Sequence, residues 1–439
     1  MTELATTSTV SGFFPVPFSC VWCISWFTRM AVHPNSKIEK LVPLLLSWFS
    51  ARARDLPWRR INDPYAIWVS EIMLQQTQVK TVIPYWERWM RELPTIRAAA
   101  QASPARLHKL WEGLGYYTRV RNLQRAAKQI VARHGGEFPE NFDAILALPG
   151  IGRYTAGAIA SIAFNQPRPI LDGNVTRVLT RIFGIHDNPR DRKTNARLWQ
   201  LAEELVTHAK GAKSAKEKSN NPLCPSRPLR EADTCSPLNQ SLMELGALIC
   251  APRSPNCAAC PVQKLCVARK KNLQEQIPRR GKRAKTTGRR FRAFLVERDG
   301  TFLVRQRPAG VVNAHLWEFP NAEVEAGNGR ARHSVRAATL AIERGTHGTD
   351  APCQLTDFRH ISAKPLCTIK HSITRYRITL EAWRAQLAKR SGRIPGRWLT
   401  LKHLHRLAFT SAHKKILARL EFERPRQGRA LRPRLSRRD

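Results

Sequence analysis

Four closely spaced cysteines place the strongest constraint on what this chain can fold into. They follow the spacing C-x6-C-x2-C-x5-C and are Cys250, Cys257, Cys260 and Cys266. Residues 1–29 do not resemble a secretory signal, because they lack a basic start and a small-residue cleavage site, so we expect no disulfide framework. Four such thiolates are typical ligands of zinc or of an iron–sulfur cluster. Zinc sites usually have two short pairs, so one short pair between longer gaps better suits a cubane cluster.

The charge of the chain indicates the chemical class of its partner. Lys and Arg number 74 and Asp and Glu 33, which gives a formal net charge of +41. This excess excludes an acidic scaffold and favours a polyanion, either nucleic acid or an anionic membrane surface. The apolar stretch 13–27 is interrupted by two prolines and is too short for a spanning helix, which needs about 20 residues. We therefore expect an intracellular, cytoplasmic protein.

The spacing of apolar residues changes once along the chain and predicts two folded domains. From about residue 36 to residue 269 they recur every three or four positions, as in IEKLVPLLLSWFSARA, which predicts an all-α part. Beyond it, FRAFLVERDGTFLVRQRP predicts two strands joined by an Asp299–Gly300 turn, and RYRITLEAW predicts another strand. With helices predicted near 333–344 and 411–420, the second part is an α+β domain.

Composition suggests where these parts begin and end. Residues 210–238 are rich in Lys, Ser, Asn and Pro and predict a flexible insertion. Its Cys224 and Cys235 are interpreted as free surface thiols, with a second metal site as the alternative. The predicted division is an N-terminal extension (1–35), a helical domain (36–249), a cysteine loop (250–268), a basic linker (269–290), an α+β domain (291–423) and an Arg-rich tail (424–439). The extension is interpreted as disordered or as lying before the true start of the protein. The tail is expected to attract nucleic acid, with a role in solubility alone as the alternative.

A glycine-rich turn between two helical stretches predicts a DNA-binding motif. In LALPGIGRYTAGAIASIAF one helix ends near Pro149–Gly150 and another begins near Arg153, which is the pattern of a helix–hairpin–helix. Gly150 and Gly152 allow a sharp turn and a close approach to a ligand. Free backbone N–H groups at the new helix start can then bind a DNA phosphate. The alternative is a packing turn between two core helices, and the positive charge favours DNA.

Two carboxylates are candidates for acid–base chemistry. Glu71 lies in the otherwise apolar helical stretch WVSEIMLQQTQVKTVIPYW, and burial would raise its pKa and make it a candidate general acid. The alternative is an ordinary Glu on a helix surface. Asp172 and Asn174 precede a helix in PILDGNVTRVL, where the alternative is simple N-capping. In the functional interpretation, Asp172 is held at a pocket mouth and stabilises positive charge on a sugar.

Taken in order, these motifs resemble those of the MutY-type adenine DNA glycosylases, within the helix–hairpin–helix DNA glycosylase superfamily. The resemblance covers most of residues 38–269 and is carried by the four cysteines and by LPWRR, SEIMLQQTQVKTVIPYW, GLGYYTRVRNL, LPGIGRYTAGAIASIAF, ILDGNV and MELGALIC. It implies one 4Fe–4S cluster on the four cysteines. It also implies an all-α glycosylase domain followed by a Nudix-like α+β domain.

The resemblance implies an activity and roles for individual residues. Members of this family flip adenine out of a duplex when it is mispaired with 8-oxoguanine or guanine, and cleave its N-glycosidic bond. Glu71 would protonate adenine and Asp172 would stabilise the oxocarbenium-like sugar. Tyr154 and Asn174 match positions that support the pocket. Matching positions around the adenine or the partner base are Trp58, Arg59, Gln76, Thr77, Leu114, Tyr116 and Glu244. We expect a nucleoid-associated monomer that binds such duplexes.

The resemblance also bears on lyase activity and on the C-terminal domain. Endonuclease III-type relatives have a lysine at the position of Tyr154, and some family members have one at Thr176, so this chain lacks both Schiff-base sites and is expected to be monofunctional. HLWEFP and IKHSITRYRI resemble an 8-oxoguanine-recognition domain, in which Thr374 is followed by Arg375 where a histidine is usual. Because ARHSVRAATLAIERG lacks a Glu-rich helix, nucleotide pyrophosphate hydrolysis is not expected.

Two other classes of protein are alternatives to this assignment. A bifunctional glycosylase–lyase acting on oxidised pyrimidines is disfavoured by Tyr154 and by the C-terminal domain, which such relatives lack. A catalytically inactive DNA-binding or iron–sulfur scaffold is disfavoured because Glu71 and Asp172 are both present.

Overall fold

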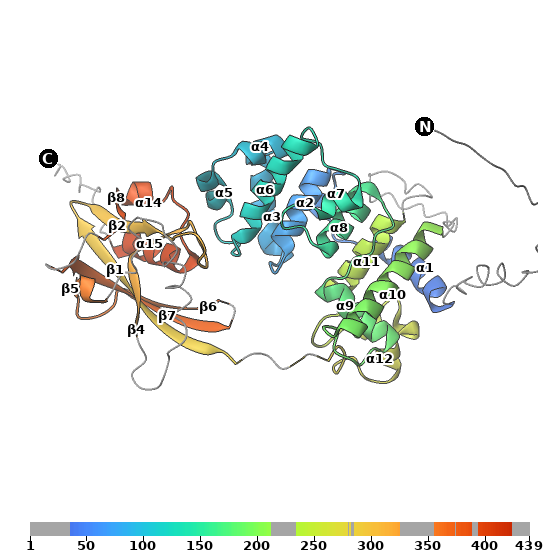
Figure 1. Ribbon diagram of the computed structural model, residues 1–439. Coiled ribbons are helices and arrows are strands. Elements are labelled where there is room, and N and C mark those ends of the chain that lie inside the picture. The colour runs from blue at the N-terminus through green and yellow to red at the C-terminus, as the bar shows by residue number, and fades with distance from the viewer. Residues whose placement is uncertain are drawn as a thin grey trace, which may run out of the picture.

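The structure is a computed structural model that describes residues 36–211, 234–279, 281, 285–324, 355–373, 375–388 and 394–423. Within these residues a helical part is followed by a mixed β-sheet, so the predicted change from an all-α to an α+β part is confirmed (Figure 1). The expected N-terminal extension, the helix near 333–344 and the Arg-rich tail lie outside the described residues.

The helical part is built from short helices with conventional caps. Asp63 caps α2 by accepting from the Tyr65 amide, and Ser103 caps α5 in the same way, each followed by a proline at the first helical position. None of the described helices is long and apolar enough to cross a membrane. The elements are α1 (Ser36–Arg52), η1 (Pro57–Arg59), α2 (Pro64–Leu74), α3 (Val79–Glu92), α4 (Ile96–Gln101), α5 (Pro104–Leu110), α6 (Thr118–Arg133), α7 (Phe142–Leu146), α8 (Arg153–Phe164), α9 (Gly173–Phe183), α10 (Arg192–Gly211), α11 (Cys235–Leu248), η2 (Cys257–Ala259), η3 (Gln263–Leu265) and α12 (Val267–Lys270).

The helices enclose two apolar cores, and α8 contributes to both. One core is formed mainly by α2 to α8 around Trp68, Trp89 and Trp111, and the other by α1, α9, α10 and α11. Ala156 of α8 is buried in the first core and Ala158 in the second. The small side chains of α8 let it pack between two layers of helices. The start of α8 is therefore fixed at the junction between the two lobes.

The segment 210–238 differs from the predicted insertion at both ends. The helix α10 continues to Gly211 and α11 begins at Cys235, so only residues 212–233, with Cys224, lie outside the described residues. The interpretation of Cys235 as a surface thiol is wrong. Its side chain is buried in the second core, because α11 packs against α1 and α10, and its thiol donates to the Val206 carbonyl at 3.8 Å.

The C-terminal part is a mixed sheet whose central pair is parallel. The strand order is β3-β2-β1-β7-β5, with β4 beside β1, β6 beside β7 and β8 beside β2, and only the β1–β7 pair is parallel among the described strands. The strands are β1 (Thr287–Arg298), β2 (Thr301–Gln306), β3 (Trp317–Glu318), β4 (Asn321–Val324), β5 (Phe358–His360), β6 (Cys367–Ile373), β7 (Tyr376–Leu387) and β8 (Arg397–Thr400).

Two predictions for this part are confirmed. Asp299 and Gly300 join β1 to β2 with φ angles of 47° and 72°, as a type I′ hairpin turn requires, and Arg298 pairs with Thr301 across the turn. The predicted C-terminal helix is α15 (Ser411–Glu423), which follows the short α14 (Leu401–Leu404); η4 (Leu355–Asp357) precedes β5. The apolar side of α15 packs on one face of the sheet.

Candidate active site

A buried carboxyl group lies where the two helical lobes meet. Glu71 of α2 is 6% exposed, so its predicted burial is confirmed and the alternative of a surface Glu is wrong. The Tyr154 hydroxyl, from the first turn of α8, donates to Glu71 Oε2 at 2.8 Å. Burial raises the pKa of Glu71 to about 7; the negative charge of Asp172 adds to this shift, and the hydrogen bond from Tyr154 opposes it. Near neutral pH this carboxyl group can therefore hold or release a proton.

The second carboxylate is held rigidly at the start of α9. Asp172 Oδ1 accepts from the Val175 amide at 2.7 Å, so the N-cap interpretation is correct as far as this oxygen is concerned. Its Oδ2 accepts from Asn174 Nδ2 at 3.0 Å, and burial raises the pKa of Asp172. Asn174 in turn accepts from the guanidinium of Arg177 at 2.8 Å. One carboxylate thus caps a helix and faces the same site as Glu71.

The helix α11 approaches this site closely because of one glycine. A Cβ atom on Gly246 would lie 2.7 Å from Cβ of Asn174, so any larger residue would push α11 away from α9. The Gly246 carbonyl accepts from Arg177 at 2.7 Å, and the same guanidinium reaches the Cys250 carbonyl at 2.7 Å. Arg177 was not predicted as a site residue, although its position one helical turn after Asn174 could have suggested this contact.

A buried ion-pair network forms the edge of the site next to η1. Glu244 of α11 is 1% exposed, and its two oxygens accept from the guanidinium groups of Arg54 and Arg59 at 2.7–3.0 Å. Burial alone would raise the pKa of Glu244, but these hydrogen bonds outweigh it and lower the pKa to about 2. Glu244 therefore stays ionised and orients Arg59. Arg54 was not predicted, because nothing in the pattern around it marks a partner so far along the chain.

Two predicted pocket residues are mainly core residues. Trp58 is 6% exposed and packs edge-on against Trp86, with ring centroids 5.9 Å apart. Leu114 is 5% exposed and belongs to the same apolar core.

The predicted partner-base strip lies on two neighbouring loops. Gln76 and Tyr116 are exposed and adopt left-handed φ angles of 60° and 48°, while Thr77 is half-buried. Arg119 joins these loops, because its guanidinium donates to carbonyl groups of both. The acceptors are Ile72, Met73 and Gln75 at the end of α2, and Leu114 and Gly115 in the other loop, all at 2.7–3.1 Å. The loops that carry Gln76 and Tyr116 are thus held together by one cation.

The predicted hairpin lies between α7 and α8. Gly150 has a φ angle of +80°, and a Cβ atom there would lie 2.6 Å from the Asn122 side chain, so a larger residue would be both strained and crowded. Gly152 caps α8, and a Cβ atom there would meet no neighbour within 4 Å. No side chain caps the first amide groups of α8, which leaves this helix start uncapped, as a phosphate-binding helix start requires.

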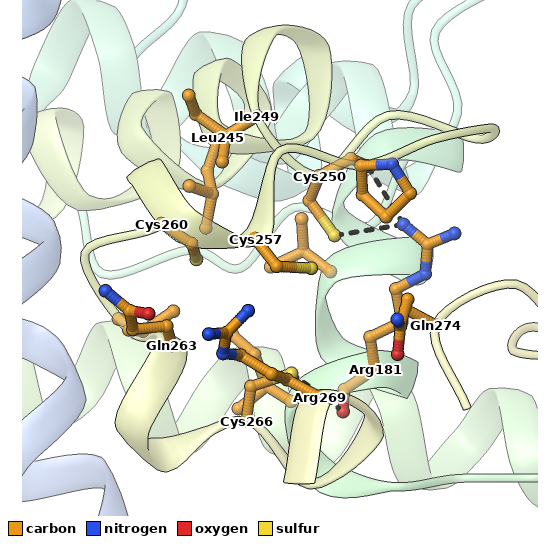
Figure 2. A pocket seen from close by; sticks show the side chains of 14 residues that line it. Arg181, Leu245, Ile249, Cys250, Cys257, Cys260, Gln263, Cys266, Arg269 and Gln274 are labelled. Atoms are coloured by element: carbon orange, nitrogen blue, oxygen red, sulfur yellow. Dashed lines mark hydrogen bonds between the residues drawn. The ribbon is translucent and has the colours of Figure 1, made fainter. Parts of the chain in front are cut away.

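The four cysteines of the predicted metal site line one cavity, together with residues of α9 and α11 (Figure 2). Arg181 is buried beside them. Its Nη1 lies 3.3 Å from Cys250 Sγ, and its carbonyl accepts from the Cys266 thiol at 3.4 Å. Burial raises the pKa of the Cys260 thiol to about 12, and the neighbouring thiols add to this shift. In the described part of the chain no three His, Cys, Asp or Glu side chains meet closely enough to hold a single metal ion.

One predicted residue is not placed. Thr374 lies outside the described residues, and its neighbour Arg375 is exposed at the turn before β7, where it stacks on Tyr376.

Comparison with known proteins agrees with this fold and site. The family model described as "HhH-GPD superfamily base excision DNA repair protein" matches residues 69–204, and a NUDIX domain model matches residues 292–419. The fold and the site thus define a base excision DNA repair glycosylase with a Nudix-like C-terminal domain.

The closer assignment comes from curated relatives. The adenine DNA glycosylase of Homo sapiens is 33% identical over a region that covers 87% of this chain and 74% of the human protein. That of Rattus norvegicus is 34% identical over a region that covers 87% of this chain and 78% of the rat protein. A solved thermostable thymine-DNA glycosylase is 30% identical, with a TM-score of 0.45, and covers 54% of this chain and 98% of its own. The chain belongs to the adenine DNA glycosylase family, so the predicted family and enzyme class are confirmed.

The buried Glu71 predicts a pH-dependent cost in stability. The pKa of Glu71 in the folded protein, about 7, lies above its ordinary value of 4.5. The protonated side chain therefore contributes its full share to the free energy of unfolding below about pH 4.5, and this contribution is lost as the pH rises through 7. Relative to the parent, the free energy of unfolding of Glu71→Gln should rise by about 3 kcal/mol as the pH is raised from 4.5 to 8. Urea unfolding of both proteins at the two pH values measures this difference. The exposed Glu87→Gln is the control and should show no such trend. An equal difference between the Glu71→Gln variant and the parent at both pH values would contradict the buried, shifted carboxyl group.

Proposed function

We propose that this protein excises adenine mispaired with 8-oxoguanine or guanine in duplex DNA, at the site formed by Glu71, Tyr154 and Asp172. The observation that carries the proposal is the buried Glu71, whose pKa of about 7 suits a general acid at physiological pH. Two carboxylates in different environments are the usual arrangement for cleaving a glycosidic bond. Membership of the adenine DNA glycosylase family supports adenine as the base. We also propose that it works as a monomer on nucleoid DNA in the cytoplasm.

The proposed chemistry assigns one task to each carboxyl group. Protonated Glu71 transfers its proton to a ring nitrogen of the flipped adenine, which makes the base positively charged. The base then accepts the electrons of the breaking sugar–base bond and leaves as neutral adenine. The sugar then carries positive charge, which ionised Asp172 stabilises. A water molecule adds its oxygen to the sugar carbon and gives a proton to Glu71, which is ionised after the first step, and this leaves an abasic site and a protonated Glu71. Asn174 and Arg177 keep Asp172 in place through this step.

Tyr154 supports a reaction that ends at the abasic site. A lyase needs an amine that attacks the sugar and forms a Schiff base. Tyr154 offers a phenol instead; burial and the charge of Glu71 raise its pKa well above the ordinary value, so it stays protonated and continues to donate to Glu71. The strand is therefore expected to stay intact until alkali or another enzyme cleaves it.

The proposed DNA-binding surface combines the hairpin with the loops of Gln76 and Tyr116. The hairpin holds the backbone through the amide groups that follow Gly152, and the exposed loop residues face the bases. Non-specific affinity then comes from the large excess of Lys and Arg and falls as the salt concentration rises.

We also propose that the four cysteines hold a 4Fe–4S cluster. Four sulfur donors around one cavity, with the guanidinium of Arg181 beside Cys250 to balance negative charge, are a donor set that suits such a cluster. When bound, the cluster supplies a rigid cross-link for the cysteine loop. Arg177 and Arg181 connect this loop to α9, whose first residues follow Asp172, so order in the loop supports order in the active site.

The substrate proposal predicts a pattern of cleavage products. Duplexes with adenine opposite 8-oxoguanine or guanine should break only after alkali, and a thymine glycol duplex should not break at all. Glu71→Gln should bind the mispaired duplexes and leave them intact, because it has no proton to donate. Gel analysis with and without alkali measures this. Breaks without alkali indicate a lyase, and intact adenine duplexes after alkali would refute the proposal.

The role of Tyr154 predicts a shift in pH dependence. Its hydrogen bond stabilises the charged form of Glu71, so Tyr154→Phe should raise the pKa of Glu71 further and keep the acid protonated at higher pH. The alkaline decline of the single-turnover rate, which should begin near pH 7 in the parent, should move upward by about one pH unit. If the decline of the rate in Tyr154→Phe begins at the same pH as in the parent, or at a lower pH, the ionisation of Glu71 does not cause it.

The cluster proposal predicts a metal content. The purified protein should contain iron and acid-labile sulfide in near-equal amounts, about four of each per chain, with little zinc. Cys257→Ser should lose most of this iron, whereas Cys367→Ser in the sheet domain should keep it. Stoichiometric zinc without sulfide would contradict the cluster.

A further inference from the structure

A single buried carboxylate joins the helical domain to the sheet domain. The loop 111–117 joins α5 to α6, and α5 lies on the side of the helical part that is nearest the sheet (Figure 1). Glu112 in this loop is 5% exposed. Its Oε1 accepts from the Phe409 amide at 2.9 Å, and its Oε2 accepts from Lys414 Nζ at 2.9 Å. Lys109 of α5 donates to the same Oε2 at 2.9 Å. Two of its three donors thus come from the other domain.

Further contacts around Glu112 show that the two domains are packed together. Lys109 also donates to the Leu407 carbonyl at 3.0 Å, and Arg121 reaches the Ala314 carbonyl at 3.3 Å. His108 and His315 stack with ring centroids 6.4 Å apart. Two residues of the sheet domain, Leu316 and Ala408, are buried in the core of the helical domain.

A carboxylate is well suited to the centre of this interface. The Phe409 amide is buried and needs an acceptor, because an unpaired buried donor destabilises a fold. The two ammonium groups on the other oxygen neutralise the charge, and such charge-assisted bonds are the stronger kind. An apolar residue at position 112 would leave the Phe409 amide and both lysines without this partner.

The same loop carries a residue of the proposed DNA-binding surface. Tyr116, four residues after Glu112, is 52% exposed. Hydrogen bonds from the helical domain also fix the backbone of this loop. Tyr85 donates to the Glu112 carbonyl at 2.9 Å, and Arg119 donates to the Leu114 and Gly115 carbonyls. The sheet domain is therefore docked on a short, rigid loop, and a change in how it docks would change the position of Tyr116.

We propose that Glu112 is a positioning residue that docks the sheet domain on the 111–117 loop, so that this domain and Tyr116 contact the base opposite the adenine as one unit. The proposal rests on the proposed function, because it concerns how the partner base is distinguished. Glu112 itself touches neither base nor sugar. Its loss should lower discrimination between partner bases and leave the chemistry at Glu71 unchanged.

The test compares the full-length parent with Glu112→Ala and Glu112→Gln, and uses Lys415→Ala as a matched control. Lys415 is exposed on α15 next to Lys414, so its substitution removes a charge beside the interface without removing a partner of Glu112. Single-turnover rates are measured with adenine opposite 8-oxoguanine and opposite guanine. Hydrogen exchange of the Phe409–Lys414 amides is measured without DNA.

We expect Glu112→Ala to speed hydrogen exchange at these amides. We also expect it to lower the ratio of the rate opposite 8-oxoguanine to the rate opposite guanine by at least about fivefold, mainly because the rate on the 8-oxoguanine duplex falls. Glu112→Gln keeps an acceptor for the Phe409 amide and should lie between the parent and Glu112→Ala, and Lys415→Ala should match the parent.

Unchanged exchange in both Glu112 variants would refute the docking contact. Faster exchange with an unchanged ratio, or an equal loss of rate on both duplexes, would refute the positioning role. If the parent releases no adenine, the proposed function fails, and the exchange measurement still decides whether Glu112 docks the two domains.

Discussion

The structure depends most on keeping one carboxyl group out of water at the junction of two helical lobes. Burial gives Glu71 a pKa of about 7, and the Tyr154 hydroxyl keeps that carboxyl group in a defined hydrogen bond. Ionising a buried acid destabilises a fold. The packing of the lobes on both sides must therefore be rigid enough to keep Glu71 buried. The packing of α8 between two cores and the close approach of α11 at Gly246 provide that rigidity.

The large positive charge has two different uses. Some arginines lie inside the protein, where they organise backbone carbonyls: Arg181 is 2% exposed and Arg177 is 6% exposed, and they fasten the cysteine loop to α9. Arg119 connects the loops of Gln76 and Tyr116, which belong to the proposed DNA-binding surface. Only the exposed remainder is free to attract a polyanion. A fork of fixed donors suits this internal role, which explains arginine rather than lysine at these positions.

Sequence patterns identified groups whose neighbours are local and missed those whose partners are distant. The Asp299–Gly300 turn and the cap at Asp172 depend on adjacent residues, and both were predicted. Cys235 was misplaced, because a polar stretch before it concealed the start of a buried helix. The contact of Glu112 with Lys414 joins residues that are 302 positions apart, and no periodicity reports such a pair.

The sequence by itself determined the kinds of chemistry present: an acid in an apolar helix, a carboxylate at a helix start, a glycine-rich hairpin and four spaced thiols. These follow from residue type and from spacing within one or two helical turns. Only the tertiary structure decided which groups meet. The hydrogen bond of Tyr154 to Glu71, the grip of Arg54 and Arg59 on Glu244, and the docking of two domains at Glu112 all arise from packing between segments far apart in the chain. Burial, which sets the pKa of Glu71, is likewise a property of the assembled core.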